Sequence, residues 1–529
     1  MSNPLKYSTT TPTGALRHDT LGAGVASIQY DQNWNSGVKY GYTGVDGTAY
    51  YLVYEPVEGT AVRVYAPINS SQLIRLAQSK GSSETTESGA LTWLSANGYY
   101  PVNRVLDNIV TDDLVLYLDS RTATSYPLSG TTWLDLSGTG ADWTIPSDVF
   151  NSSTGVMNYA SDQSSLTPPA ALQSTTDLTV EVLYKPNTGG IYTGCCDTIF
   201  GRYDFRFFQI GASLYAMIGF DDGNGTRVYQ HPAYTVSYDR WHHVLAIRRD
   251  NRYIIWIDGV EKYNTTYGTG LSLWDPSETY YLSTTRQTNV DYSSCRIYTK
   301  GLSDSEILQN YFQGPIVTDD LVFALDASNL SSFEPGTTAA YSLTGSSGAA
   351  AGDGVLTNGV GFSNVANGTW DFDGVDDTIL SSYTLPSGDK TLEFWVNYNT
   401  LASSGGGGYS LMGVQQVNAY LYSGIQSNGS GYSYAGNTGG AYSYTFSAST
   451  WYHIATVMDN GTTRHYVNGI QVATKAYTVA NASTIGVSIG AINSSHEMDA
   501  LIPITRIYNR ALTAAEVEQN YNANIKKFT

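Results

Sequence analysis

The feature that most constrains this chain is an internal repeat in its carboxy-terminal four-fifths. Three motifs occur twice in the same order, and the separation between the second and third motifs is the same in both copies. They are IVTDDLVLYLD at 109–119 and IVTDDLVFALD at 316–326, tryptophan-led segments at Trp241 and Trp451, and Arg-Ile-Tyr segments at Arg296 and Arg506. Because matched spacing indicates two copies of one structural unit, we predict tandem domains at 111–315 and 316–529.

Each copy carries the signals of antiparallel strands joined by tight turns. After each tryptophan, residues alternate in the way that places every second side chain on one face of a strand. The pairs Asp258-Gly259 and Asn468-Gly469 then follow an apolar run, and such pairs favour type I′ hairpin turns. Glycine (53 residues) and tyrosine (43 residues) are abundant, whereas charged residues make up only 14%. The composition therefore predicts a mainly β protein.

One short helix is expected near the end of each copy. Ser303 with Glu306, and Thr513 with Glu516, have the spacing of a capping box. A domain of about 200 residues that is rich in strands and carries one such helix is predicted to be a two-sheet antiparallel sandwich.

These motifs resemble the concanavalin A-like, laminin G-like domains. The Trp-x-His strand, the (Asp/Asn)-Gly hairpin, the Arg-Ile-Tyr strand and the Leu-(Ser/Thr)-x-x-Glu helix carry the resemblance, as does WDFDGVDDTIL at 370–380. The resemblance implies two tandem jelly-roll sandwiches. The opening IVTDDLVLYLDS with SYPLSGTTWLDLSG, and the closing NRALTAAEVEQNYNA, also resemble units of structural proteins of tailed bacteriophages, notably cyanophages. This second resemblance implies a place in a virion, in a tail fibre, baseplate appendage or head decoration.

Residues 1–110 lie outside the repeat. The segment 50–67 reads as a hairpin, and 70–79 and 83–98 read as short helices, so we predict a small α+β domain. In a phage-like protein this domain is the natural candidate for attachment to other virion proteins. The alternative is a third ordinary domain with no special role.

Charge, cysteines and hydropathy restrict partners and location. The net charge of −19 argues against nucleic acid as a partner, and no apolar run is long enough for membrane insertion. MSNPLKYSTT does not resemble a signal peptide, and the three cysteines Cys195, Cys196 and Cys295 are expected to be reduced thiols. We therefore expect a protein assembled in the host cytoplasm and resident on the virion as a homo-oligomer.

No residue is predicted to be catalytic. Glu181 and Glu393 occupy equivalent strands but each stands alone, and we predict solvated outward positions for both. A retaining glycosidase needs two carboxylates about 5 Å apart. His243 and His453 alternate with apolar residues and are predicted to be structural. The chain is predicted not to be an enzyme.

Calcium is the one metal that the sequence brings into consideration. Four carboxylates, Asp371, Asp373, Asp376 and Asp377, surround Gly374, and hard oxygen ligands on a tight turn suit Ca²⁺. The alternative is that this stretch is a sharp turn between strands. The first copy has VMNYASDQ at 156–163 and lacks most of these acidic residues.

Six tyrosines of the second copy are the candidate carbohydrate-binding residues. They are Tyr420, Tyr422, Tyr432, Tyr434, Tyr442 and Tyr444. Tyrosine offers a flat apolar face to sugar CH groups and a hydroxyl to sugar oxygens. The alternative is a tyrosine-rich face that packs on a neighbouring subunit. The first copy offers Tyr203, Phe205 and Phe207 instead, so binding is predicted mainly in the second.

Together these features predict a virion structural protein that displays two lectin-like domains for adhesion to host-surface polysaccharide. Two alternatives remain open: a purely architectural virion protein without a sugar ligand, and a polysaccharide-degrading enzyme.

Overall fold

A computed structural model describes most residues between 109 and 528 and, before residue 109, short strands and a few single residues. Within 109–528, the segments outside the described part are 123–124, 127–129, 152–153, 161–162, 168–176, 189–196, 203–204, 222–226, 231, 267–278, 284–288, 345–351, 402–408, 415–419, 427, 437, 478–481 and 492–496. The chain divides into two compact units, Met1–Asn108 with Ile525–Thr529, and Ile109–Asn524.

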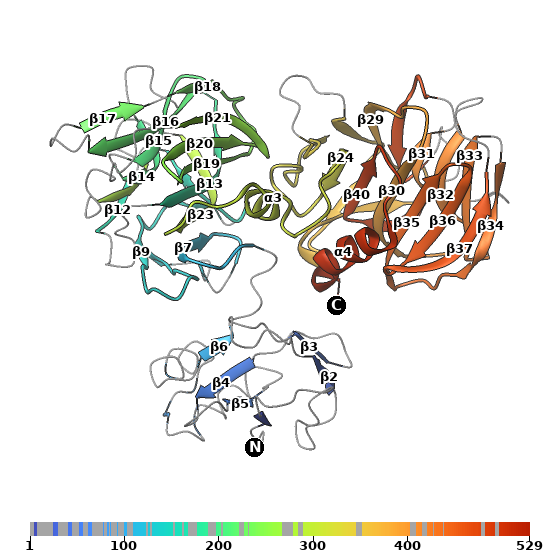
Figure 1. Cartoon of the computed structure of the whole chain (residues 1–529), viewed down its shortest axis with the longest axis horizontal. Coiled ribbons are helices and arrows are strands. Elements are labelled where there is room, and N and C mark those ends of the chain that lie inside the picture. Colours follow the sequence, from blue (N-terminus) through green and yellow to red (C-terminus); the bar gives the residue numbers. More distant parts are fainter. Residues whose placement is uncertain are drawn as a thin grey trace. The chain divides into compact units, whose positions relative to one another are not determined.

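The first unit contains a four-stranded sheet in the order β1-β5-β4-β6 and a β2-β3 pair (Figure 1). The strands are β1 (Leu5–Tyr7), β2 (Val25–Gln29), β3 (Gly41–Gly44), β4 (Leu52–Pro56), β5 (Val62–Tyr65) and β6 (Tyr100–Val102). Antiparallel pairing of β4 with β5 confirms the predicted hairpin. The predicted helices at 70–79 and 83–98 fall almost entirely outside the described residues.

The first repeat folds into two large antiparallel sheets and a separate β8-β9 pair. One sheet has the order β10-β11-β23-β13-β19-β20-β21, with β7 beside β23, and the other has the order β12-β22-β14-β15-β16-β17, with β18 beside β16. The strands are β7 (Leu114–Asp119), β8 (Thr132–Trp133), β9 (Trp143–Thr144), β10 (Phe150–Asn151), β11 (Val156–Tyr159), β12 (Ser164–Leu166), β13 (Leu178–Pro186), β14 (Asp197–Arg202), β15 (Phe205–Ile210), β16 (Ser213–Asp221), β17 (Arg227–Gln230), β18 (Ala233–Thr235), β19 (His242–Arg249), β20 (Arg252–Ile257), β21 (Val260–Thr266), β22 (Tyr280–Leu282) and β23 (Val290–Tyr298), followed by α3 (Asp304–Phe312).

The second repeat has the same plan (Figure 1). Its sheets have the orders β27-β28-β39-β30-β35-β36-β37, with β24 and β30 both beside β40, and β25-β26-β29-β38-β31-β32-β33-β34. The elements are β24 (Leu321–Asp326), β25 (Ala339–Ala340), β26 (Gly354–Thr357), β27 (Gly361–Ser363), η3 (Val365–Asn367), β28 (Thr369–Asp373), β29 (Thr378–Thr384), β30 (Lys390–Tyr398), β31 (Tyr409–Val414), β32 (Tyr420–Ile425), β33 (Ser430–Gly436), β34 (Thr438–Thr445), β35 (Trp451–Asp459), β36 (Thr462–Val467), β37 (Ile470–Ala476), β38 (Gly486–Ile489), β39 (Asp499–Ile502), β40 (Ile504–Tyr508) and α4 (Ala514–Asn524). The following η4 (Ile525–Lys527) is counted with the first compact unit. The prediction of a mainly β chain with two sandwiches is confirmed.

The predicted turns form because their residues accept positive φ. Asp258 and Gly259 have φ of 51° and 73°, and Asn468 and Gly469 have φ of 50° and 78°, as a type I′ turn requires. Gly259 is also needed for its small size, because a Cβ there would lie 2.6 Å from the ring of Tyr311 on α3.

Each sandwich has one large core between its sheets and a smaller one beneath its helix. Ile307 of α3 is buried against Leu245 and Ile247 on the outer face of one sheet. Val517 of α4 is buried in the same way against Ala455 and Val457. The predicted capping boxes begin both helices. We call the sheet beneath the helix the helix-side sheet and the other the far sheet.

A three-residue link joins the two sandwiches, which lie within the same compact unit. Helix α3 ends at Phe312, and Ile316 already belongs to the next buried cluster. Tyr311 and Phe312 pack there with Ala324 and Leu343 of the second sandwich. The joint is therefore a small apolar core in its own right.

The repeated tryptophans differ in environment. Their equal positions in the repeat predict equivalent buried sites for Trp241 and Trp451, but only Trp241 is fully buried. Trp241 packs against Val156 and against Leu330 of the second sandwich, and Lys185 lies 5.5 Å above its ring. The contact between sandwiches accounts for this burial.

Cys295 is a free, buried thiol, and Cys195 and Cys196 lie outside the described residues. Among the described residues, no helix is both long and apolar enough to span a membrane.

Candidate functional site

The two strand glutamates are buried, so the prediction of solvated outward positions is wrong. Glu181 on β13 forms an ion pair with Arg296, its register partner on β23, and lies 2.7 Å from Nε2 of His243. Asn310 on α3 donates to its second oxygen at 2.8 Å. Burial alone would raise the pKa of Glu181, but Arg296, His243 and Asn310 hold that pKa at about 2.

The second sandwich repeats this cluster. Glu393 accepts from Arg506 Nη1 and from Asn520 Nδ2, both at 2.7 Å, and His453 Nε2 lies 3.5 Å away. Burial again raises the pKa of Glu393, while His453, Arg506 and Asn520 lower it to about 2. The prediction that His243 and His453 are structural agrees with their burial beside these carboxylates. Both glutamates therefore fasten a helix to a sheet and are not available as proton donors.

The same cluster holds the beginning of each sandwich. Asn310 accepts from the backbone N–H of Val110 at 2.8 Å, and Asn520 accepts from that of Val317 at 2.8 Å. The hydroxyls of Tyr298 and Tyr508 donate to the carbonyls of the same two valines. The tyrosine of each Arg-Ile-Tyr motif and the helix asparagine thus hold the first residues of the domain against its last strand and helix.

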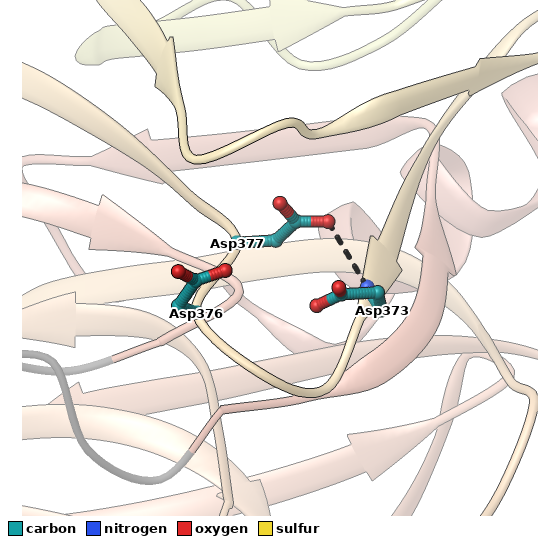
Figure 2. A group of neighbouring side chains, drawn as sticks. All are labelled: Asp373, Asp376 and Asp377. Carbon is teal, nitrogen blue, oxygen red and sulfur yellow. Dashed lines mark hydrogen bonds between the residues drawn. The ribbon is translucent and has the colours of Figure 1, made fainter.

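The acidic turn between β28 and β29 brings together three of the four predicted metal ligands. Figure 2 shows Asp373, Asp376 and Asp377 around this turn. One carboxylate oxygen of each lies within 4.8 Å of those of the other two. The backbone N–H of Asp373 donates to Asp377 at 3.1 Å. Asp371 accepts from the side chain of Asn399 at 3.4 Å and does not belong to the group.

Asp377 is the unusual member of this group. It is almost fully buried, and its Oδ1 has no hydrogen-bond donor in the structure. Burial raises the pKa of Asp377, and the carboxylates of Asp373, Asp376 and Asp371 add to this effect. A hard cation would remove the repulsion and supply a partner for Oδ1, so the donor set fits Ca²⁺.

Calcium binding at this turn stays a prediction. Saturating Ca²⁺ is expected to raise the unfolding midpoint, because a ligand at 100 times its Kd stabilises the folded state by about 2.7 kcal/mol. Thermal unfolding with and without Ca²⁺ measures the shift. Asp377→Asn should abolish it, whereas Asp112→Asn, at an exposed aspartate of the first sandwich, should leave it intact. Equal shifts in both variants would contradict the site.

Three of the six predicted tyrosines meet on the outer face of the far sheet of the second sandwich. Tyr422 on β32 is the register partner of Tyr434 on β33, and their ring centroids are 5.5 Å apart with planes 25° apart. Tyr432, two residues before Tyr434 on β33, also stacks on Tyr422, and their ring centroids are 6.1 Å apart. All three rings are half-buried. Tyr420 pairs with Gly436 in register, but its side chain lies outside the described residues.

Glycine makes room for these rings. A Cβ at Gly439, the register partner of Tyr434 on β34, would lie 2.1 Å from the Tyr434 ring and 3.0 Å from the Tyr432 hydroxyl. Gly413 on β31 pairs with Tyr422 from the other side. The tyrosines therefore stand on a sheet surface stripped of neighbouring side chains.

Tyr442 and Tyr444 do not join them, which corrects the prediction. Tyr442 is 5% exposed and stacks on His465 inside the sandwich, with ring centroids 4.0 Å apart. Tyr444 packs against the same core. The cause is the register between β33 and β34, which pairs Ala435 with Thr438 and so places even-numbered residues of the two strands on opposite faces.

The first sandwich has a different surface at the corresponding strands. β14 and β31 each carry a bulge, and matching these bulges shows which residues of the two far sheets correspond. Arg206 then corresponds to Tyr422, and Met217 corresponds to Tyr434. These side chains are 8% and 7% exposed. Of the aromatic residues that the first copy offers instead of the tyrosines, Phe205 and Phe207 lie in the core, and Tyr203 is outside the described residues.

Sequence comparison supports the fold. The family model Laminin_G_3, described as the concanavalin A-like lectin/glucanases superfamily, matches residues 158–308 and 372–518, which together make up more than half of the chain. No match is found among curated proteins.

Three solved structures are among those similar to this chain. They are the botulinum neurotoxin type G receptor-binding domain (16% identity, TM-score 0.31, covering 39% of this chain and 51% of that one), the botulinum neurotoxin serotype D binding domain (12%, 0.35, 75% and 96%), and domain 4 of AbnA, a GH43 extracellular arabinanase from Geobacillus stearothermophilus, in complex with arabinotriose (18%, 0.31, 38% and 98%). The chain spans about half the length of the type G domain.

Proposed function

Since the chain belongs to the concanavalin A-like lectin/glucanases superfamily, we propose that it binds carbohydrate through the outer face of the far sheet of its second sandwich. The observation that carries this proposal is the group of three half-buried tyrosine rings, Tyr422, Tyr432 and Tyr434, on a glycine-lined surface.

Tyrosine rings at such a place suit a sugar for two physical reasons. The apolar ring face covers the CH groups of a pyranose and removes water from both surfaces. The hydroxyl at the ring edge exchanges hydrogen bonds with sugar hydroxyls. Cross-strand stacking of Tyr422 on both neighbours restrains the rings before a ligand arrives, which lowers the entropy cost of binding.

Binding without catalysis is part of the proposal. The equivalent glutamates Glu181 and Glu393 are buried, ionised and engaged by arginine, so neither can act as the acid of a glycosidase. Release of reducing sugar by the purified protein would contradict this part.

We further propose that the chain works on the surface of a phage particle, attached through residues 1–110. The resemblance of the repeated opening and closing motifs to phage structural proteins supports this location. Many copies on one particle would turn a weak affinity for each sugar into firm adhesion to a cell. Particles that lack the protein but adsorb normally would favour an architectural role instead.

Removal of one ring tests the binding face. Tyr434→Ala is expected to weaken binding of the full chain to its glycan at least 10-fold, equivalent to about 1.4 kcal/mol, because the stacking surface and its hydroxyl are lost together. Glycan arrays followed by titration calorimetry measure this.

The matched control is Tyr215→Ala. Tyr215 takes the register position of Tyr432 in the first sandwich and is also half-buried. This variant should bind as the unaltered chain does. Equal losses in Tyr434→Ala and Tyr215→Ala, or no loss in either, would place the binding surface elsewhere.

A further inference from the structure

One row of paired residues crosses all eight strands of the far sheet in the second sandwich. Each member is the register partner of the next, and because direct partners project to the same side, the row lies on one face. Its members, from β25 to β34, are Ala339, Val355, Leu380, Ser488, Gly413, Tyr422, Tyr434 and Gly439. The row thus continues the tyrosine group across the whole sheet.

Large side chains stand at two places in this row, and the stretch between them carries only small ones. At one of these places Val355 and Leu380 are partners on β26 and β29 and are 53% and 50% exposed. The rings of Tyr422 and Tyr434 stand on the other side. Between them lie only Ser488 and Gly413, and the Ser488 hydroxyl donates to the carbonyl of Gly413 at 3.3 Å.

No member of the row carries a charge, although the chain as a whole has a net charge of −19. Further along the same strands, the residues that share this face are uncharged as well. They are Thr357, Thr378, Ser382, Gly486, Gly424, Tyr432, Ala441 and Ser443. A ligand carboxylate or sulfate laid on the row between Tyr434 and Leu380 would lose water and gain no opposite charge from its members, which is costly.

We propose that the row is an extended track for a neutral polysaccharide that lies across the strands and spans at least the distance from Tyr434 to Leu380. Neighbouring strands are about 4.8 Å apart, so these four steps cover about 19 Å. The track takes several sugar units, with the tyrosines stacking at one end and the aliphatic pair covering CH groups at the other. This inference rests on the proposed function and adds the class and the path of the ligand.

The first sandwich shows why the track belongs to the second alone. There Arg206 replaces Tyr422, its Nη1 donates to Thr198 at 2.7 Å, and its guanidinium lies 5.5 Å from the ring of Phe208. Buried side chains and a positive charge therefore take the place of the half-exposed tyrosines.

The experiment uses the full chain and two panels of probes. Neutral polymers (dextran, xylan and mannan, with their oligosaccharides) and anionic polymers (polygalacturonate and hyaluronate) are titrated at low and high salt. We expect binding of a neutral polymer, an affinity that rises with oligosaccharide length up to several units, and little dependence on salt. Binding of anionic polymers alone would overturn the proposal.

Two variants test the path. Leu380→Asp and Ser488→Phe should each weaken polymer binding at least 10-fold, the first by placing a charge on the track and the second by filling its stretch of small side chains. The control is Ile470→Asp, which places the same charge at an aliphatic residue that is 69% exposed and outside the row. Unfolding midpoints confirm that each variant folds.

The outcomes separate the two proposals. If Tyr434→Ala abolishes binding while Leu380→Asp and Ser488→Phe bind normally, the tyrosine site stands and the track is refuted. If no polymer of either class binds, both proposals fail.

Discussion

Replacing Glu393 by alanine is expected to lower the free energy of unfolding by about 3–5 kcal/mol, because it leaves the buried guanidinium of Arg506 without its counter-charge. Asn520 loses its acceptor at the same time, and with it one of the bonds that hold α4 on the sheet. Urea unfolding followed by tryptophan fluorescence measures the loss.

The control is an ion pair of the same sandwich that faces solvent. Asp459 and Arg464 are 2.8 Å apart, but both side chains are more than one-third exposed. Asp459→Ala should therefore cost less than about 1 kcal/mol. Similar losses for Asp459→Ala and Glu393→Ala would show that burial does not set the strength of the internal pair.

The same cluster predicts how the chain responds to acid. The folded-state pKa of Glu393 is lowered to about 2, so its contribution is complete above the unfolded pKa of about 4.3 and is lost as the pH falls from there towards 2. Glu393→Gln removes the titrating group, and the stability of this variant should fall less steeply over that interval.

Replacing Phe312 by alanine should cost about 3–5 kcal/mol and should also separate the unfolding of the two sandwiches. Phe312 is buried in the joint with Ala324 and Leu343, so its removal leaves a cavity between the sandwiches, not within either one. Differential scanning calorimetry should show one transition for the unaltered 109–524 region and two for the variant.

The repeat itself supplies the control. In α4 the residue equivalent to Phe312 is Asn522, which is exposed. Asn522→Ala should change the unfolding free energy by less than about 0.5 kcal/mol and leave the number of transitions unchanged. A single transition in Phe312→Ala would mean that other contacts between the sandwiches, such as the ion pair of Lys185 with Glu334 and the packing of Trp241 on Leu330, couple them without the apolar joint.

The sequence predicted those parts of the fold that depend on local chemistry. The Asp-Gly and Asn-Gly turns and the two capping boxes form as expected, because few residue types satisfy their geometry. The burial of Glu181 and Glu393 could not be predicted, since the arginines that neutralise them come from strands more than 100 residues further along the chain.

Only three of the six predicted tyrosines were placed correctly on the outer face, again because the outcome depends on how strands pair. Alternation within a strand is visible in the sequence, but the face that a strand presents depends on the turn before it. The register that pairs Ala435 with Thr438 places Tyr442 inside the sandwich, while Tyr434 stays outside. The opposite half of the row, at Leu380 and Ser488, comes from strands that are distant in the sequence and are united only by pairing.

In each sandwich the first residues are hydrogen-bonded to the last helix, so the two ends of the domain lie next to each other. Val317, near the start of the second sandwich, donates its backbone N–H to Asn520 on the last helix. Val110 donates in the same way to Asn310 in the first sandwich. A domain whose entry and exit adjoin can be circularly permuted, or spliced whole into another chain, without stretching its surroundings. Tandem duplication of such a domain needs only a short linker, which here consists of Gln313, Gly314 and Pro315.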